Sequence, residues 1–340
     1  MKLLIIRFSS IGDIVLTTPV VRCLKEQLPD VEIHYLTKKQ FIPILQSNPY
    51  LTKIHLFKDN FQELVPKLKA EQFDHVIDLH KNLRSHYIRY KLGRPATTFP
   101  KLNFRKWLIT SLHIDQLPRI HIVDRYFMAA EKLDVKNDLK GLDYFLLDSE
   151  QVNIPQRFPE IKGEFIAIAI GAKHQTKIFP ARRVADLCNQ LPLPVILLGG
   201  KEDMARGEKI VEVTTSTVVN ACGVLPLNAS ASVIDQATWV ISNDTGLMHI
   251  AAALKKPIIS IWGNTIPAFG MYPYLPEGHE QLSTIIEVEG LKCRPCSKLG
   301  YNACPKGHFD CMEKIDMKKI LDAESRMPDA GYQMPDANDK

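Results

Sequence analysis

Residues 240–263, VISNDTGLMHIAAALKKPIISIWG, combine residue types and a spacing that point directly to chemistry. The apolar run from Trp239 to Ile241 predicts a buried strand, which ends at a glycine-bearing polar loop. A helix of small residues over 247–254 and a second apolar strand over 258–262 follow. The first N–H groups of a helix have no partner within it, and the positive end of the helix dipole lies there. We therefore expect an anion site at this helix start, with the diphosphate of a nucleotide as the anion.

A carboxylate occupies a similar place near the N-terminus. Asp13 ends the segment RFSSIGD, which follows a predicted strand over residues 3–7 and opens a predicted helix over 14–27. The helix dipole favours an ionised carboxylate there, and such a group can accept a proton from a hydroxyl nucleophile. The spacing by itself favours the alternative interpretation, in which Asp13 is only an N-cap. The loop lacks G-x-G-x-x-G, so the plain dinucleotide-binding pattern is absent.

Three further polar residues follow predicted strands or open predicted helices in the second half of the chain. Lys177, in the segment GAKHQTKIFP, can offset phosphate charge, although loop lysines are commonly only solvated. Glu202, after two glycines, can accept hydrogen bonds from ribose hydroxyls or be an exposed acid at a helix start. His249 lies four residues after Thr245 on the same helix face, which favours a site over a structural role.

Four cysteines cluster near the C-terminus with the spacing C-x2-C-x7-C-x6-C. Four thiols can complete a tetrahedral structural zinc site, and the opening C-x-x-C is typical of one. The second pair does not have that spacing, so reduced structural cysteines or a redox-sensitive pair are favoured over zinc. We expect no catalytic metal. The four cysteines are Cys293, Cys296, Cys304 and Cys311.

Composition and charge restrict the class of protein. The chain has 340 residues, enough for two domains of about 150 each, with 45% hydrophobic and 24% charged residues. Its net charge is only +5, but residues 81–125 contain ten Lys or Arg and two Asp, with Phe104 and Trp107 interleaved. This basic run is either a solvated helix face with a loop or a landing site for an anionic partner, such as a phosphate-bearing lipid, an acidic sugar or nucleic acid.

Strand and helix patterns alternate with short connections, which predicts parallel sheets covered by helices on both faces. The alternation restarts after a linker at 148–162. We therefore expect one Rossmann-like domain over residues 1–155, a second over 156–324, and a disordered tail over 325–340 that repeats MPDA. The apolar stretch at the N-terminus is too short for a signal peptide, and no run approaches the length of a membrane span. A cytoplasmic location is expected, with contact to the inner-membrane surface.

Taken together and in order, these segments resemble glycosyltransferase family 9, the ADP-heptose:lipopolysaccharide heptosyltransferases. The resemblance covers about residues 1–320. It implies the GT-B architecture, in which two Rossmann-like domains with parallel sheets face each other across a cleft, with the donor mainly in the second domain and the acceptor in the first. The matching segments are RFSSIGDIVLTTP, IDLHKNLRS, GAKHQTKIFP, GGKED, SNDTGLMHIAAALKKP and CRPC…CPKGHFDCM.

The resemblance also implies roles for individual residues. Asp13 corresponds to the catalytic base, and Lys177 and Glu202 to contacts with the phosphate or ribose of the donor. We assign the acceptor to Ser10, Gly12 and Arg84 in the first domain. The phosphate-binding turn would consist of Asp244, Thr245, Gly246, Leu247 and His249.

The activity implied is inverting, metal-independent transfer of heptose from ADP-heptose to an anionic lipid-linked saccharide of the lipopolysaccharide core. A nucleotide-diphospho-sugar carries a good leaving group, so one base suffices, and no cofactor is required because the ADP-sugar is itself the substrate. Nucleic acid is not an expected partner. Three alternatives remain open: transfer of another sugar such as a hexose by the same fold, a sugar-nucleotide epimerase, and a non-catalytic nucleotide- or glycan-binding protein.

Overall fold

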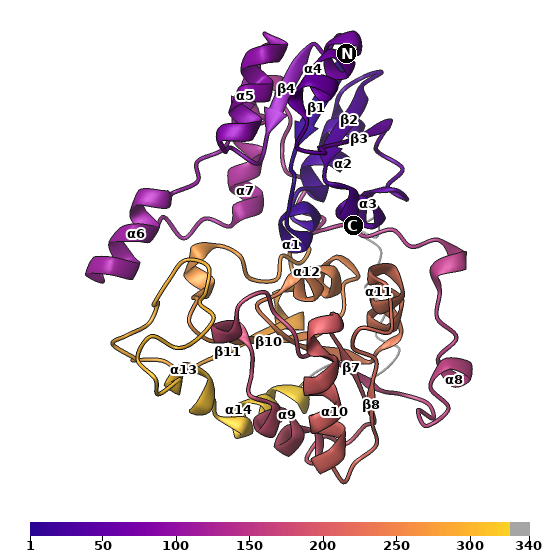
Figure 1. Cartoon of the computed structure of the whole chain (residues 1–340), viewed down its shortest axis with the longest axis vertical. Helices are drawn as coiled ribbons and strands as arrows, with labels where there is room; N and C mark the ends of the chain where they lie inside the picture. The colour runs from indigo at the N-terminus through magenta and orange to yellow at the C-terminus, as the bar shows by residue number, and fades with distance from the viewer. Residues whose placement is uncertain (327–340) are drawn as a thin grey trace. The chain divides into compact units, whose positions relative to one another are not determined.

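The computed structural model describes residues 1–326, which form two compact units (Figure 1). The first unit consists of Met1–Leu102 and Ile120–Phe145, and the second of Asn103–Arg119 and the chain from Leu146 onward. From residue 327 on, the tail predicted to be disordered lies outside the described residues. Within the described part of the chain, no helix is both long enough and apolar enough to span a membrane.

The first unit contains a five-stranded parallel sheet with the strand order β3-β2-β1-β4-β5. Strand β1 (Lys2–Ile6) lies at its centre. Its four apolar residues, Leu3 to Ile6, are fully buried there, as expected for a parallel strand covered on both faces. It pairs in parallel with a strand on each side. The other strands are β2 (Glu32–Thr37), β3 (Lys53–Leu56), β4 (His75–Asp78) and β5 (Ala96–Thr98).

The prediction of one continuous helix over residues 14–27 is wrong. The structure has a short helix α1 (Ile11–Val15) and a separate helix α2 (Thr18–Gln27). Pro19 lies in the first turn of α2, where its missing N–H costs nothing, whereas a longer helix running through it would lose a hydrogen bond. The other helices of this unit are η1 (Lys39–Phe41), α3 (Ile42–Leu45), α4 (Phe61–Ala70), α5 (Leu83–Leu92), α7 (Ile122–Phe127) and η2 (Glu131–Leu133).

The second unit contains a six-stranded parallel sheet with the order β11-β10-β9-β6-β7-β8. Every residue of β9 (Trp239–Asn243) and β10 (Ile258–Trp262) is buried, as the apolar runs predict for central parallel strands. The edge strand β11 (Ser283–Glu287) was not predicted, because its residues are mostly part-exposed and its apolar run is short. The remaining strands are β6 (Ile166–Ala169), β7 (Val195–Leu198) and β8 (Val218–Asn220).

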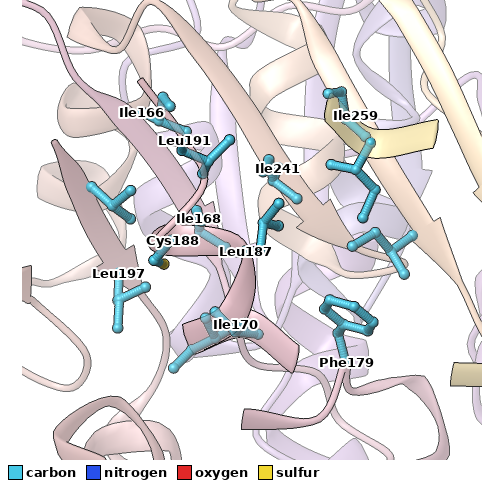
Figure 2. Close-up of a cluster of buried hydrophobic side chains, with 14 of the residues drawn as sticks. Ile166, Ile168, Ile170, Phe179, Leu187, Cys188, Leu191, Leu197, Ile241 and Ile259 are labelled. Carbon is cyan, nitrogen blue, oxygen red and sulfur yellow. The ribbon is translucent and has the colours of Figure 1, made fainter. Parts of the chain in front are cut away.

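One face of this second sheet carries the core shown in Figure 2. Ile166, Ile168 and Ile170 alternate along the chain and so point to the same face, where Leu187 and Cys188 of α9 pack against them. The other helices are α6 (Asn103–Leu112), η3 (Asp148–Glu150), α8 (Ile154–Arg157), η4 (Gln175–Lys177), α9 (Ala181–Cys188), η5 (Lys201–Asp203), α10 (Met204–Val213), α11 (Leu227–Gln236), α12 (Gly246–Ala253), η6 (Pro267–Phe269), η7 (Glu280–Leu282), α13 (Asp310–Glu313) and α14 (Met317–Glu324).

Helix α6 groups with the second unit, although the sequence places residues 103–119 within the predicted domain of residues 1–155. Ile109 and Leu117 form a small hydrophobic cluster with Phe269, and these contacts account for the grouping. Both units have the parallel α/β architecture that the sequence predicts.

Candidate active site

The first candidate site is the Asp13 turn, which we define as residues 7–13, between β1 and the first turn of α1. The backbone N–H and the hydroxyl of Ser10 donate to Asp13 Oδ2 at 3.0 and 2.7 Å. The Arg7 guanidinium pairs with Asp13 Oδ1 at 2.5 Å. Arg7 also donates to the carbonyl oxygens of Ser9, at 2.9 Å, and Leu79, at 2.5 Å. The carboxylate is therefore held by a cation that the end of β4 fixes in place.

Asp13 is not an N-cap, contrary to the interpretation that spacing alone favours. Ser10 is the N-cap of α1, and Asp13 stands at the third helical position, where the two form a capping box. Burial on its own would raise the pKa of Asp13, but the charge of Arg7 and the hydrogen bonds from Ser10 outweigh it and lower the pKa to about 2. The side chain is 24% exposed, so this ionised carboxylate remains open to a ligand.

The residues assigned to an acceptor lie at or beside this turn. Ser10 binds Asp13 directly, and Gly12 is buried within α1. Arg84 lies in the first turn of α5, which follows β4, the strand paired with β1, and its guanidinium forms an exposed ion pair with Asp59 at 2.9 Å. The sequence analysis missed Asp78, which is fully buried at the end of β4 and accepts hydrogen bonds from the Lys81 N–H in the following loop and from the Ser85 hydroxyl in α5.

The second candidate site is the Asp244 turn, which we define as residues 243–249, at the end of β9. Lys177 Nζ lies 2.5 Å from Asp244 Oδ2, and the Thr265 hydroxyl donates to the same oxygen at 2.8 Å. The three residues follow β6, β9 and β10, which are neighbours in the sheet, so the carboxyl ends of three strands converge here. The ion pair with Asp244 holds the Lys177 ammonium group in place. The ammonium group, and not the carboxylate, is the group that can bind an anion.

The start of α12 lies in this turn. Thr245 is the N-cap in an extended conformation, and its side chain makes no capping hydrogen bond, so the first amides of α12 point beyond the helix end. Gly246 and Leu247, in the first turn, are partly exposed. His249 is only 3% exposed and is therefore a buried side chain of α12 rather than a surface group. The backbone of this turn is the accessible part.

Asn243 connects the Asp244 turn to the neighbouring strand and was not identified from the sequence. Its side-chain amide donates to the Ile170 carbonyl oxygen at 3.1 Å, and its Oδ1 accepts from the Phe179 N–H at 3.2 Å. These bonds fix the loop between β6 and α9, which carries Lys177. An asparagine at the end of a fully buried strand is the signal that could have revealed this role.

Glu202 and Asp203 differ sharply in exposure, although they are adjacent. Glu202, the predicted ribose contact, is exposed in η5. Asp203 is buried, accepts a hydrogen bond from the Gly200 N–H at 3.0 Å, and forms an ion pair with Arg206. A Cβ at Gly171 would lie 2.0 Å from an Asp203 carboxylate oxygen, so any larger residue there would displace that carboxylate. Asp203 therefore shapes the loop, and Glu202 is the carboxylate that a ligand could contact.

The cysteine-rich segment, residues 288–311, contacts the loop that follows β10 and so stabilises the second site. The Arg294 side chain donates to the carbonyl oxygens of Gly263 and Thr265, at 2.5 and 2.8 Å, and pairs with Glu287 at 2.5 Å. Thr265 in turn binds Asp244. The segment thus holds the loop after β10 in the position that orients the carboxylate, a connection that the sequence analysis did not identify.

The four clustered cysteines differ in environment. Cys293, Cys296 and Cys304 are partly exposed, whereas Cys311 is buried in the hydrophobic core of the second unit. Cys293 Sγ lies 3.8 Å from His308 Nε2. Among residues 1–326, no three Cys or His side chains of this segment bring their ligand atoms within 4.8 Å of one another. The arrangement described here is that of separate thiols.

The two parallel α/β units match the GT-B fold of solved heptosyltransferase structures. The model of glycosyltransferase family 9 (heptosyltransferase) matches residues 61–300, so the chain belongs to this family. The resemblance to glycosyltransferase family 9 that the motifs predict is therefore confirmed.

Curated relatives agree with this assignment. The chain is 28% identical over 327 residues to lipooligosaccharide heptosyltransferase 2 of Haemophilus influenzae, covering 88% of this chain and 93% of the relative. It is 26% identical over 314 residues to lipopolysaccharide heptosyltransferase 3 of Escherichia coli, covering 79% and 88%. Among solved structures, ADP-heptose lps heptosyltransferase II of E. coli superposes with a TM-score of 0.75 at 21% identity, covering 96% of this chain and 98% of the other, which confirms the fold.

Proposed function

We propose that this protein transfers heptose from ADP-heptose to an anionic, lipid-linked saccharide of the lipopolysaccharide core, with inversion at the anomeric carbon and without a metal ion. The observation that carries the proposal is the arrangement of Lys177, Asp244 and Thr265 beside the start of α12. It offers one cation and a set of backbone N–H groups to a diphosphate. The reaction would take place at the cytoplasmic face of the inner membrane, where a nucleotide sugar and a lipid acceptor can meet.

In this proposal the second unit binds the donor. The diphosphate gains negative charge as the bond to the sugar breaks, and the helix amides and Lys177 stabilise that charge. Exposed Glu202 accepts hydrogen bonds from the ribose hydroxyls. A solved relative with 19% identity and a TM-score of 0.68 is described as E. coli heptosyltransferase WaaC with ADP, which supports the choice of an adenine nucleotide.

The first unit supplies the base. As the acceptor hydroxyl attacks, its proton becomes acidic and moves to Asp13, which is ionised because of Arg7 and Ser10. A carboxylate with a low pKa is a weak base, so it serves late in bond formation, when the proton is already acidic. One base and a good leaving group are sufficient for direct displacement, and this differs from glycosidases, which need two carboxylates.

The same groups support our proposal that transfer needs no metal ion. In enzymes that use Mg²⁺ with nucleotide sugars the ion neutralises the diphosphate, and here Lys177 and the helix start provide that charge. We propose that the cysteine cluster has a structural role, with any zinc bound there being unnecessary for transfer.

A direct test measures product formation by purified enzyme with a core saccharide acceptor and either ADP-heptose or an ADP-hexose. The proposal predicts an acceptor enlarged by one heptose, with the inverted anomeric configuration by NMR. Preferential use of the hexose would change the sugar that we assign. A rearranged nucleotide sugar formed without acceptor would replace transfer with epimerisation, and nucleotide binding without any product would indicate a non-catalytic protein.

A further inference from the structure

Helix α6 and the residues just beyond it expose several large apolar side chains. Phe104, Trp107 and Leu112 are 68%, 50% and 53% exposed, and Ile114 just beyond the helix is 46% exposed. The rings of Phe104 and Trp107 stack with their centroids 5.9 Å apart. Clustered exposed aromatic residues on one helical face are uncommon in soluble proteins and mark a surface that binds something apolar.

The opposite face of α6 is the one that packs against the rest of the second unit. Ile109 is the buried residue of α6, and it packs with Leu117 against Phe269 of the second unit. Phe104 and Trp107, five and two residues before Ile109, lie on the other side of a helix with 3.6 residues per turn, whereas Leu112, three residues after Ile109, lies nearer to the anchored side. The helix is therefore anchored along one side only, and the stacked pair of aromatic rings lies on its outer side.

The charge around this face has one sign. Residues 101–114 contain Lys101, Arg105 and Lys106 and no Asp or Glu. The next acid, Asp115, already forms an ion pair with Arg119. Arg105 is exposed, whereas the Lys106 ammonium lies over the Phe269 ring on the anchored side of the helix. An apolar helix face with an exposed basic residue beside it complements a surface with an apolar interior and anionic groups at its border.

We propose that α6 docks this protein on the phospholipid bilayer, with Phe104 and Trp107 inserted among the headgroups and the exposed Arg105 beside them against lipid phosphates. The proposal rests on the proposed function, since a lipid-linked acceptor lies in such a bilayer. Tryptophan prefers the membrane interface, where its ring is partly apolar and its N–H remains hydrated. Docking would keep the enzyme at the surface where its acceptor lies, without a membrane-spanning helix.

Vesicle binding of the whole protein tests this directly. The probe is a set of vesicles of phosphatidylethanolamine with phosphatidylglycerol, compared with pure phosphatidylcholine. Trp107 is the exposed member of the three tryptophans, because Trp239 and Trp262 are buried, so a blue shift of fluorescence on binding reports its environment. We expect the double variant F104S/W107S to bind the anionic vesicles at least about tenfold more weakly and to lose the blue shift.

A matched control is V213S, since Val213 is 63% exposed on α10, away from the basic run. It should bind vesicles as the unmodified protein does. Transfer to a delipidated, water-soluble acceptor should be unchanged in F104S/W107S, whereas transfer to acceptor in vesicles should fall.

Three outcomes would overturn the proposal. Equal vesicle binding by F104S/W107S and the unmodified protein would remove α6 as the docking surface. Loss of transfer to the soluble acceptor with vesicle binding intact would assign the face to acceptor recognition, and salt-resistant capture of a protein in place of vesicles would assign it to a protein partner. If the unmodified protein transfers no heptose to the soluble acceptor but still binds vesicles through α6, the proposed function fails and the docking surface stands.

Discussion

The Asp13 turn and the Asp244 turn use the same elements for different purposes. In each, a strand near the middle of a parallel sheet ends, a carboxylate follows, and a helix begins. In the Asp13 turn the carboxylate belongs to the first turn of the helix and accepts hydrogen bonds from both the N–H and the hydroxyl of the N-cap residue, Ser10. In the Asp244 turn the carboxylate lies before the helix and turns toward Lys177, which leaves the helix start uncapped by a side chain.

The difference indicates a division of labour. In the Asp13 turn the cation, Arg7, is held by carbonyl oxygens and neutralises the carboxylate, so the exposed group is an ionised oxygen that can take a proton. In the Asp244 turn the carboxylate and Thr265 hold the cation, so the exposed groups are an ammonium and backbone amides that suit a negative charge. One turn therefore suits proton transfer, and the other suits charge stabilisation.

The largest effect is expected from Asp13→Asn. The amide cannot accept the acceptor proton, so kcat should fall by about 10²- to 10⁴-fold while the KM for the donor changes little. Steady-state kinetics with ADP-heptose measure both. Asp30→Asn is the control, because Asp30 is an exposed carboxylate in the same unit and asparagine tolerates its left-handed backbone. Turnover above half of normal in Asp13→Asn would remove the base from this turn.

Lys177→Met should weaken donor binding by about 10- to 100-fold, because a charge-assisted contact to phosphate is lost and Asp244 is left without its ion pair. Titration calorimetry with ADP measures the change. Lys209→Met is the control, since Lys209 is exposed on α10. A dissociation constant for ADP equal to that of the unmodified protein would place the phosphates elsewhere.

The low pKa of Asp13 predicts a pH dependence of stability. Burial opposes the charged form, but Arg7 and Ser10 lower the pKa from 3.8 to about 2. The folded state therefore gains stability from ionised Asp13 above about pH 4 and loses it as the pH falls toward 2, an effect of about 2 kcal/mol. Urea unfolding at pH 3 and pH 6 should show a smaller pH dependence in Asp13→Asn. Because Asp13 is already ionised above pH 4, any fall of kcat/KM with decreasing pH in that range should come from the titration of another group.

Asp244→Asn should have a smaller effect than Lys177→Met. Lys177 keeps its charge but loses its ion pair with Asp244. The affinity for the donor should therefore fall by about 3- to 10-fold. Comparison of the two variants by calorimetry separates a positioning role from direct contact. An effect of Asp244→Asn larger than that of Lys177→Met would mean that the carboxylate itself binds the donor.

The smallest effect is expected from metal removal. Transfer by enzyme treated with a chelator and desalted should remain within about twofold of untreated enzyme, because Lys177 and the start of α12 supply the charge. Restoration of a lost activity by Mg²⁺ would contradict metal independence. Restoration by Zn²⁺ alone, with loss of thermal stability in Cys293→Ser, would point to a structural zinc in the cysteine cluster.

The sequence predicted the fold well where apolar runs are long and continuous. The predicted strands over residues 195–198 and 258–262 match β7 and β10 because their side chains are buried on both faces. The sequence failed where local and tertiary effects compete, as at Pro19, which splits the predicted helix over 14–27. It also missed β11, which is mostly part-exposed at the sheet edge.

For the site, the sequence identified residues that follow strands but not the residues that hold them. Lys177 and Asp244 are 67 positions apart, and only the adjacency of β6 and β9 brings them together. Arg7 and Arg294 were missed as supports, because their partners are mainly backbone carbonyl oxygens, which no residue type reveals. Motif spacing thus indicated candidate ligand-binding groups, whereas the residues that fix them in place are determined by packing.

Donor binding by Asp13→Asn and Lys177→Met, measured side by side with ADP-heptose under conditions without acceptor, tests the division of labour most directly. We predict that Asp13→Asn binds the donor within about twofold of the unmodified protein, whereas Lys177→Met binds it at least about tenfold more weakly. The reverse pattern, with donor affinity lost in Asp13→Asn and kept in Lys177→Met, would contradict the account.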